Sequence, residues 1–279
     1  MSNSINTNIK SLMASNALAL NGRAQQTTME SLATGKRINR ASDDAAGLSI
    51  RETITSQIKG LDSAVRNAND GISLLQEADG ALNETSSMLQ RMRELAVLSR
   101  TDTYSSVQKS ALNSEFVQLR SQVDKIALNT QWNGMNILDG TGGVAGTDAN
   151  FEFQIGANAG DTYAVSIADM TLSTNLAIDT ATISTATNAS AAIESLDAAM
   201  SFLNTQRATI GSAVNRLSHA VDNLTLAAQT ASESRSKVED TDYATATSDL
   251  ARQQIIQQAA TAILAQANQQ QQSVLSLLK

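Results

Sequence analysis

The chain has 279 residues, enough for one or two domains, with only 3% aromatic residues and no proline or cysteine. The absence of cysteine excludes disulfides, thiol catalysis and cysteine-ligated metal sites, and the scarcity of aromatic rings favours close helix–helix packing over a thick globular core. The net charge is −7 and no basic face is visible, which argues against nucleic-acid binding; no apolar run reaches the roughly 18 residues that would insert into a membrane.

The two ends of the chain are poor in charge. Residues 1–21 carry one charged side chain, Lys10, and do not have the pattern of a cleavable signal peptide, so we expect the protein to stay in the cytoplasm or to leave by a route that needs no such signal. From residue 250 onward, only Arg252 and Lys279 are charged. The N-terminal stretch nevertheless keeps a heptad stripe that predicts a helix with a partner: Ile5, Ile9, Leu12, Asn16 and Ala19.

A long helix is expected from about residue 44 to residue 98. Ser42 is suited to cap it, with Asp43 and Asp44 in the first turn, where the helix dipole favours anions. The alternative, a metal or acid–base site at this Asp pair, lacks a third ligand or a histidine nearby. The helix keeps its phase across Gly60 and Gly71, each of which costs about 1 kcal/mol that packing must offset. Its seam alternates steps of four and three: Ile54, Ile58, Leu61, Val65, Ala68, Ile72 and Leu75.

The middle of the chain mixes a second helix with the only expected strands. A polar turn at 101–105 leads into a stripe of the same spacing, and the short connection predicts an antiparallel helical hairpin. A glycine-rich loop then starts at Asn133-Gly134, and two alternating apolar runs predict a β-hairpin. Residues 170–188 are rich in Ala, Ser and Thr without a period, and we expect an irregular surface segment. The stripe is Leu112, Phe116, Leu119, Val123 and Ile126; the alternating runs are Phe151, Phe153, Ile155 and Tyr163, Val165, Ile167.

Two further helices close the chain. The first starts near Ala189, and the second follows a charged break at 239–242. The predicted fold class is mainly α: a long helical hairpin or coiled-coil rod with paired N- and C-terminal helices and a small β-hairpin cap. Since the charge-poor ends cannot bury their stripes within one thin rod, we expect helices of neighbouring copies to cover them. The stripes are Ile210, Val214, Leu217, Val221, Leu224, Ala228 and Ala231, then Ile256, Ala260, Ile263, Ala267, Val274 and Leu277.

No catalytic constellation is visible in the sequence. His219 is the sole histidine and has no partners that would make it a base or a ligand, so a surface position is the simpler interpretation. Nucleophile-elbow, phosphate-loop and dinucleotide motifs are absent. We therefore predict a protein that is not an enzyme and that needs no cofactor or metal.

Several long motifs in order resemble the bacterial flagellins. The longest, at 32–48, reads LATGKRINRASDDAAGL, and Lys36 and Trp132 stand where the family commonly has an aliphatic residue and phenylalanine. The resemblance covers both ends of the chain and leaves only about 145–190 unanchored. The other matching stretches are 66–73, 80–84, 89–97, 130–134, 138–140, 153–157 and 262–269.

The resemblance implies a subunit that self-polymerises into the extracellular flagellar filament for swimming motility. It implies export through the flagellar type III export apparatus with the help of an export chaperone, and contact with filament cap and hook-junction proteins. It also implies three parts: 1–43 with 236–279 as a terminal coiled-coil domain of the inner filament, 44–140 with 189–235 as a helical rod, and 141–188 as a small β-hairpin and variable surface segment.

The expected sites are of three kinds. Polymerisation seams are expected at Ile5, Ile9, Leu12, Ile256, Ile263, Val274 and Leu277. The resemblance implies export-chaperone contacts at Leu250, Ile255, Ile263 and Leu264, and contacts with a Toll-like innate receptor at Arg91, Leu95 and Glu115. The alternatives left open are a hook–filament junction-type protein, which would be present in few copies, and another secreted helical interaction protein.

Overall fold

The computed structural model describes residues 7–143 and 150–276 and divides into two compact units. Unit 1 contains Met1–Ser56 and Thr230–Lys279, and unit 2 is Gln57–Gln229. The predicted three-part division of the chain is a finer statement and stays a prediction. The helices are α1 (Ile9–Thr34), α2 (Ala45–Arg100), α3 (Ser106–Asn129), α4 (Ala186–Glu239) and α5 (Tyr243–Ser276); the strands are β1 (Gln131–Trp132), β2 (Met135–Asn136), β3 (Asn150–Gln154) and β4 (Thr162–Ser166).

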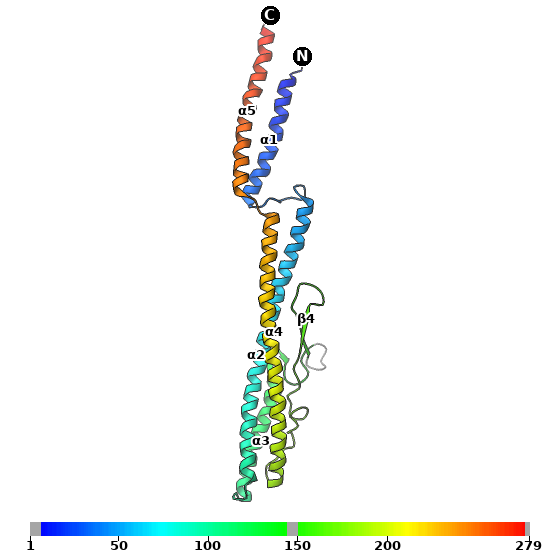
Figure 1. Ribbon diagram of the computed structural model, residues 1–279, viewed down its shortest axis with the longest axis vertical. Coiled ribbons are helices and arrows are strands. Elements are labelled where there is room, and N and C mark those ends of the chain that lie inside the picture. The colour runs from blue at the N-terminus through cyan, green and yellow to red at the C-terminus, as the bar shows by residue number, and fades with distance from the viewer. Residues whose placement is uncertain (1–6, 144–149, 277–279) are drawn as a thin grey trace. The chain divides into compact units, whose positions relative to one another are not determined.

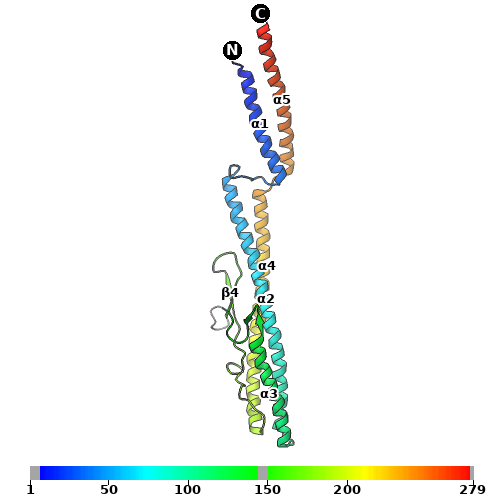
Figure 2. The same ribbon diagram turned by 180° about the vertical axis from the view of Figure 1, so that it is seen from behind.

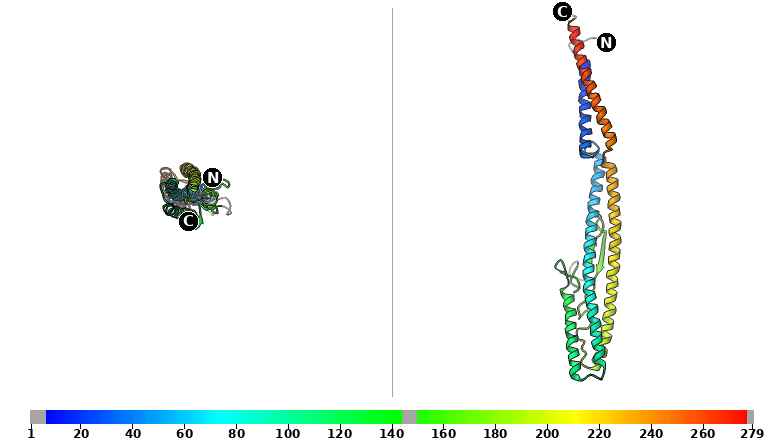
Figure 3. Two further views of the ribbon diagram at one scale, coloured as in Figure 1. Left: turned by 90° about the horizontal axis from the view of Figure 1, so that it is seen from below. Right: turned by 90° about the vertical axis from the view of Figure 1, so that its left-hand side faces the viewer.

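Unit 2 is a helical bundle with a continuous apolar core. After the turn that follows α2, α3 folds back along it, as the side view in Figure 3 shows, and α4 lies beside them (Figure 2). Leu89 of α2, Phe116 of α3 and Leu203 of α4 are fully buried in one cluster. The predicted stripes of these helices are confirmed in this unit, because their residues are buried or half-buried.

The start of α2 corrects the predicted cap. Asp44, not Ser42, caps the helix: its carboxylate accepts a hydrogen bond from the Gly47 amide at 2.9 Å, and its carbonyl accepts one from Leu48 at 3.0 Å. Asp43 instead closes the preceding turn by accepting from the amides of Asn39 and Arg40. The prediction therefore placed the cap two residues too early, because an aspartate side chain reaches the third amide as readily as a serine does.

Two β-hairpins follow α3. The first, β1–β2, was not predicted; it turns through Asn133 and Gly134, both with positive φ (50° and 78°), as a two-residue hairpin turn requires. The second, β3–β4, confirms the predicted hairpin, with Phe151 opposite Val165 and Phe153 opposite Tyr163.

The β3–β4 hairpin explains the two glycines in α2. A Cβ on Gly71 would stand 3.0 Å from the Phe153 ring, and one on Gly60 would stand 3.0 Å from the Ala157 Cβ. The glycines therefore let the hairpin and its loop approach the helix backbone, which offsets their poor helix propensity. On α4, the Arg216 guanidinium lies 4.3 Å from the centre of the Tyr163 ring, and this cation–π contact links the hairpin to α4.

The segment from Met170 to Ile183, which we call the strap, corrects the prediction of a surface segment. It has no regular structure, as predicted, but its apolar side chains are buried in the unit 2 core. Side chains of α3 hold its backbone: Asn113 accepts from the Ile183 amide at 2.8 Å, and Arg120 donates to the Ala181 carbonyl at 2.9 Å. The buried strap residues are Met170, Leu172, Leu176, Ile178 and Ile183.

In unit 1, α1 and α5 lie side by side and antiparallel (Figure 1). Gly35 ends α1 in the left-handed conformation at φ 72°, and Asp242 caps α5 by accepting from the Ala244 amide at 2.9 Å. The hydrogen bond from the Thr245 hydroxyl, followed by those from the backbone amides, lowers the pKa of Asp242 below its ordinary value.

The connections next to α1 and α5 are tied together within unit 1. The Thr241 amide donates to the Gly35 carbonyl at 2.9 Å, and the buried Glu239 carboxylate forms ion pairs with Lys36 and with Arg51 at 3.6 Å. Lys36, which departs from the aliphatic residue common in the resembled family, thus has a partner here. The ties fix where α1 ends and where α5 begins.

Candidate functional site

The face that α1 and α5 share holds mainly small and polar residues, with a few leucines. On α1 the covered positions include Ala14, Asn21 and Thr28, and on α5 they include Gln253 and Ala260. These positions recur every seven residues, which is the spacing of a helix pair, and half-buried leucines at 18, 32, 250 and 264 stand between them. Small side chains let the two backbones approach closely, and they bury little apolar area.

Polar side chains form hydrogen bonds across this seam. The Asn8 amide donates to the Ala267 carbonyl at 3.1 Å, and the Asn21 amide donates to the Gln253 carbonyl at 2.8 Å. The Gln253 side-chain amide donates to the Thr28 hydroxyl at 3.0 Å. These residues were not predicted from the sequence, because no regular spacing of the amides marks them.

Several large apolar side chains of the terminal helices are exposed and not covered by the other helix. Ile9 and Leu12 are each 58% exposed, Met13 is 68% exposed, and Ile263 is 58% exposed. Such side chains in close succession on both helices form the apolar surface that we call the outer face. It comprises Ile9, Leu12, Met13, Leu20 and Met29 of α1 and Ile255, Ile256 and Ile263 of α5.

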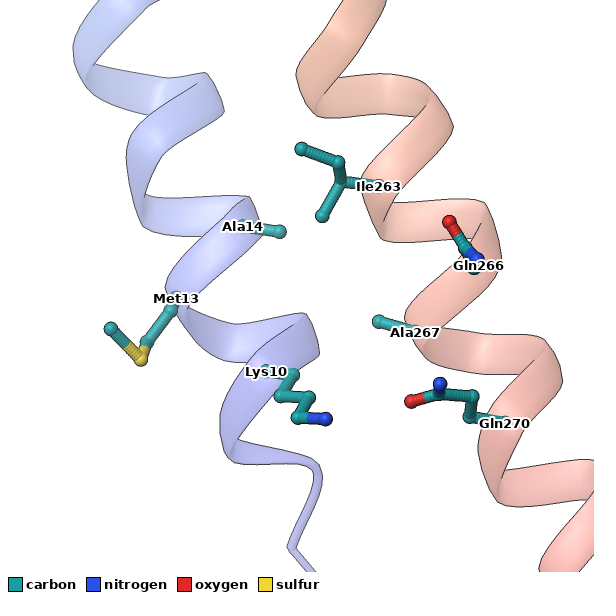
Figure 4. Close-up of a pocket in the computed structure, with 7 residues that line it drawn as sticks. All are labelled: Lys10, Met13, Ala14, Ile263, Gln266, Ala267 and Gln270. Atoms are coloured by element: carbon teal, nitrogen blue, oxygen red, sulfur yellow. The ribbon is translucent and has the colours of Figure 1, made fainter.

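A shallow groove of about 460 Å³ opens between the helices. Figure 4 shows Ala14 and Ala267 pointing toward the opposite helix from its two walls, whereas Met13 points away. The remaining lining residues are Lys10, Ile263, Gln266 and Gln270. The groove is therefore bordered by both the seam and the outer face.

The predicted polymerisation seams are not covered within the subunit. Ile9, Leu12, Ile256 and Ile263 are exposed, together with Asn16 and Ala19, and their role in contacts between copies stays a prediction. Of the stripe predicted for α5, Ala260 and Ala267 do face α1. Ile5 and Leu277 lie outside the described residues, and Val274 lies on α5 outside the side chains that are described.

The predicted receptor contacts lie in unit 2. Arg91 and Glu115 form an ion pair at 2.9 Å between α2 and α3, and Arg91 also pairs with Glu94 at 3.0 Å. Hydrogen bonds to Glu94 and then to Glu115 raise the pKa of Arg91 above its ordinary value. Leu95 is fully buried, which corrects its placement among surface contacts: the leucine packs in the core below the pair.

The predicted chaperone contacts do not share one face of α5. Leu250 and Leu264 are half-buried on the side toward α1, whereas Ile255 is 67% exposed and Ile263 belongs to the outer face. His219 is exposed on α4, as the sequence predicted. Among the described residues, no cluster of three or more histidine or acidic side chains is placed to hold a metal ion, and no helix combines the length and hydropathy needed to cross a membrane.

A chain with a self-contained helical bundle and a helix pair that turns its apolar residues outward belongs to the class of structural helical subunits. Comparison with known proteins gives the family. The family model for the bacterial flagellin N-terminal helical region matches residues 5–142, and that for the C-terminal helical region matches residues 193–278. The chain belongs to the bacterial flagellin family.

Individual relatives match the sequence along almost the whole chain. It is 41% identical over 276 residues to flagellin of Halalkalibacterium halodurans and 39% identical over 306 residues to flagellin of Bacillus subtilis, each match covering 99% of both chains. The crystal structure of Bacillus cereus flagellin matches with a TM-score of 0.51 at 35% identity, over 57% of this chain and 88% of that one. The protein is a structural subunit of the flagellar filament, which serves motility, and the hook–filament junction alternative is not favoured.

Proposed function

We propose that the outer face of α1 and α5 is the surface through which this filament subunit polymerises. The observation that supports it is the distribution of side chains on the helix pair: mainly small and polar residues lie between the helices, whereas several large apolar side chains are more than half exposed. Burying one such side chain stabilises by about 1.5–3 kcal/mol, so several of them buried between copies supply the affinity that one subunit lacks. An apolar surface of this kind on a soluble chain is typical of an interaction site.

The replacement Ile263→Asp tests the proposal. A charge placed in a buried contact between copies should raise the critical concentration for polymerisation at least about 100-fold, since each factor of ten corresponds to about 1.4 kcal/mol. Sedimentation and electron microscopy after salting-out measure it. Ile263→Leu, which keeps the apolar area, should polymerise normally, and so should Val107→Asp, which places the same charge on an exposed apolar site of unit 2. Filament yield from Ile263→Asp equal to that of the native chain would reject the proposal.

We further propose that the chain is exported unfolded through the flagellar type III apparatus, without a cleaved signal, and that an export chaperone binds Leu250, Ile255, Ile263 and Leu264. Because two of these residues face α1 and two face outward, a chaperone that contacts all four must bind α5 when it is separated from α1. A chain whose helices are covalently locked by a thiol crosslink between Ala14→Cys and Ala267→Cys should therefore lose chaperone binding in calorimetry. Equal binding before and after locking contradicts the proposal.

Outside the cell, the proposed partners are the filament cap, the hook-junction proteins and a Toll-like innate receptor. Arg91 and Glu115 are the proposed receptor contacts, because their ion pair is about half-exposed on the helical surface. Leu95 supports them from below. Loss of receptor signalling in Arg91→Ala, compared with Lys237→Ala, tests this part, and an unchanged response would exclude it. Filament growth in a strain without the cap protein tests the cap contact.

A further inference from the structure

The exposed sulfur atoms of this chain belong to methionine, because the sequence contains no cysteine. Peroxides oxidise thioethers to sulfoxides, and susceptibility follows exposure to solvent. In the part of the chain that the structure describes, four methionines are buried in the unit 2 core or half-buried against it, and three are exposed. The first group is Met88, Met92, Met170 and Met200; the second is Met13 at 68%, Met29 at 45% and Met135 at 44% exposure.

Two of the exposed methionines, Met13 and Met29, belong to the outer face on α1, whereas Met135 belongs to strand β2 of unit 2. Met13 borders the groove between α1 and α5, but its sulfur points away from α5 (Figure 4). An oxygen atom added to this sulfur would therefore project from the helix pair and leave the contacts between α1 and α5 in place. Oxidation of Met13 changes the surface offered to other copies and not the fold.

The reaction of such a side chain with hydrogen peroxide is a two-electron oxygen transfer. A sulfur lone pair attacks one peroxide oxygen, the S–O bond forms as the O–O bond breaks, and the departing hydroxide takes the proton of the transferred oxygen and leaves as water. The thioether is oxidised and the peroxide is reduced. The product carries a polar S=O group in place of an apolar sulfur. Burial of this group weakens an apolar contact between proteins unless a hydrogen-bond donor meets it there.

We propose that Met13 and Met29 are oxidation sites that convert the outer face from a form that assembles into a form that does not. This inference rests on the proposed role of the outer face in polymerisation. In a filament, other copies cover the two side chains and protect them, so a peroxide acts on free subunits. The conversion is reversible, because methionine sulfoxide reductases restore the thioether with electrons from thiols.

Peroxide treatment of the soluble full-length chain tests the proposal. Hydrogen peroxide is applied to free subunits and then destroyed with catalase, and the sulfoxide at each methionine is measured by peptide mass spectrometry. For each chain, the critical concentration for seeded polymerisation is compared before and after treatment. This ratio corrects for any change that a substitution itself makes in assembly. Circular dichroism of the treated chain shows whether its helices are intact.

In the native chain, Met13 and Met29 should be oxidised at least about tenfold faster than the methionines buried in the unit 2 core, and the critical concentration should rise at least about tenfold. In a chain with both Met13→Leu and Met29→Leu, which keep the apolar volume, treatment should leave the critical concentration unchanged. Met135→Leu, at a site about as exposed as Met29 but outside the outer face, should leave the chain as sensitive as the native one. Both sulfoxide reductases with dithiothreitol should return the oxidised native chain to its original critical concentration.

An unchanged critical concentration after full oxidation of Met13 and Met29 overturns the proposal, and so does an equal rise in the chain that carries both leucines. A loss of helical signal on oxidation also overturns it, because the effect would then act through folding.

These outcomes differ from failure of the proposed function, which is judged by polymerisation of untreated Ile263→Asp. If Ile263→Asp fails to polymerise while the oxidised native chain polymerises normally, the assignment of the outer face holds and the oxidation sites do not. If Ile263→Asp polymerises normally while oxidation of Met13 and Met29 still blocks assembly, the oxidation sites hold and the assignment of the whole outer face does not.

Discussion

Unit 2 and the α1–α5 pair have the same heptad spacing, but different types of residue occupy the positions between their helices. In unit 2 the positions between helices hold residues such as Leu89, Phe116 and Leu203, all fully buried. Between α1 and α5 they hold residues such as Ala14, Asn21 and Gln253, while Ile9 and Ile263 face outward. The comparison teaches that a heptad stripe shows where helices pack and does not show whether the partner helix belongs to the same chain.

The difference has an energetic consequence. A buried leucine or phenylalanine contributes about 1.5–3 kcal/mol from the removal of its apolar surface from water, whereas the small side chains of the α1–α5 seam contribute much less. Unit 2 can therefore offset the conformational entropy lost on folding with its own core. The terminal pair depends on surface from other molecules for a comparable gain.

The largest expected effect is on the free energy of unfolding, which should depend on unit 2 and hardly on the exposed residues of α1. Phe116→Ala should destabilise unit 2 by about 3–5 kcal/mol, because it removes a fully buried ring from the core. Ile9→Ala, on the exposed side of α1, should change the stability of the soluble chain by no more than about 0.5 kcal/mol and yet weaken polymerisation. Urea unfolding followed by fluorescence of Trp132, the sole tryptophan, which packs against the unit 2 core, measures the first quantity.

A reversed outcome, with Ile9→Ala lowering the urea midpoint as much as Phe116→Ala does, would show that the terminal pair shares the folding cooperativity of unit 2. The proposed contrast between the two regions would then be wrong. Filament yield serves as the second measurement for both variants.

A smaller effect tests how tightly unit 2 is packed. Gly71→Ala gains about 1 kcal/mol of helix propensity but places a Cβ 3.0 Å from the Phe153 ring, and such overpacking costs about 1–3 kcal/mol. We expect a net loss of stability. Gly80→Ala, in the same helix with nothing within 4 Å of the added Cβ, should instead stabilise by about 0.5–1 kcal/mol. Thermal unfolding by circular dichroism compares them, and equal shifts of the two variants would contradict the close docking of the hairpin.

The smallest effect concerns a surface ion pair of unit 2. The hydrogen bond from Arg93, at 2.6 Å, lowers the pKa of Asp197 below its ordinary value. Because the pKa is lowered in the folded chain, the pair stabilises fully above the unfolded value of about 3.9, and this stabilisation disappears as the pH falls through the folded value. The urea midpoint of Asp197→Asn should lie slightly below that of the native chain at pH 7 and approach it below about pH 3. If the difference between the two urea midpoints grew on acidification, the lowered pKa of Asp197 would be contradicted.

Much of unit 2 could be predicted from its sequence, because its apolar residues lie inward and so mark the helices and their contacts. The stripe from Ile54 to Leu75 continues through Gly60 and Gly71 as predicted, although the hairpin that packs on those glycines lies 82 to 97 positions away. Local patterns cannot show such a contact. The Asn133-Gly134 turn, by contrast, was a local signal of a hairpin, although only a loop was predicted there.

The terminal helices were predicted correctly as helices, and their apolar stripes were expected to be covered by other copies. Ile9 and Leu12 are exposed in the structure, and their role between copies stays a prediction. A second stripe of α1, which includes Ala14, Asn21 and Thr28, faces α5. Since both stripes have helical periodicity, periodicity could not show which of them faces α5. The buried strap escaped prediction for a related reason: its path follows α3, so its apolar residues have no period of their own.

The strap has a consequence for how the sequence of this protein can vary. Its backbone is held by side chains that belong to α3, Asn113 and Arg120, and its own contribution is limited to a few buried apolar residues. The exposed positions between them, such as Ser173 and Thr174, carry no part of that attachment to α3. A short peptide tag inserted there should leave the bundle intact, which makes the strap a practical site for labelling the subunit with a dye or an epitope.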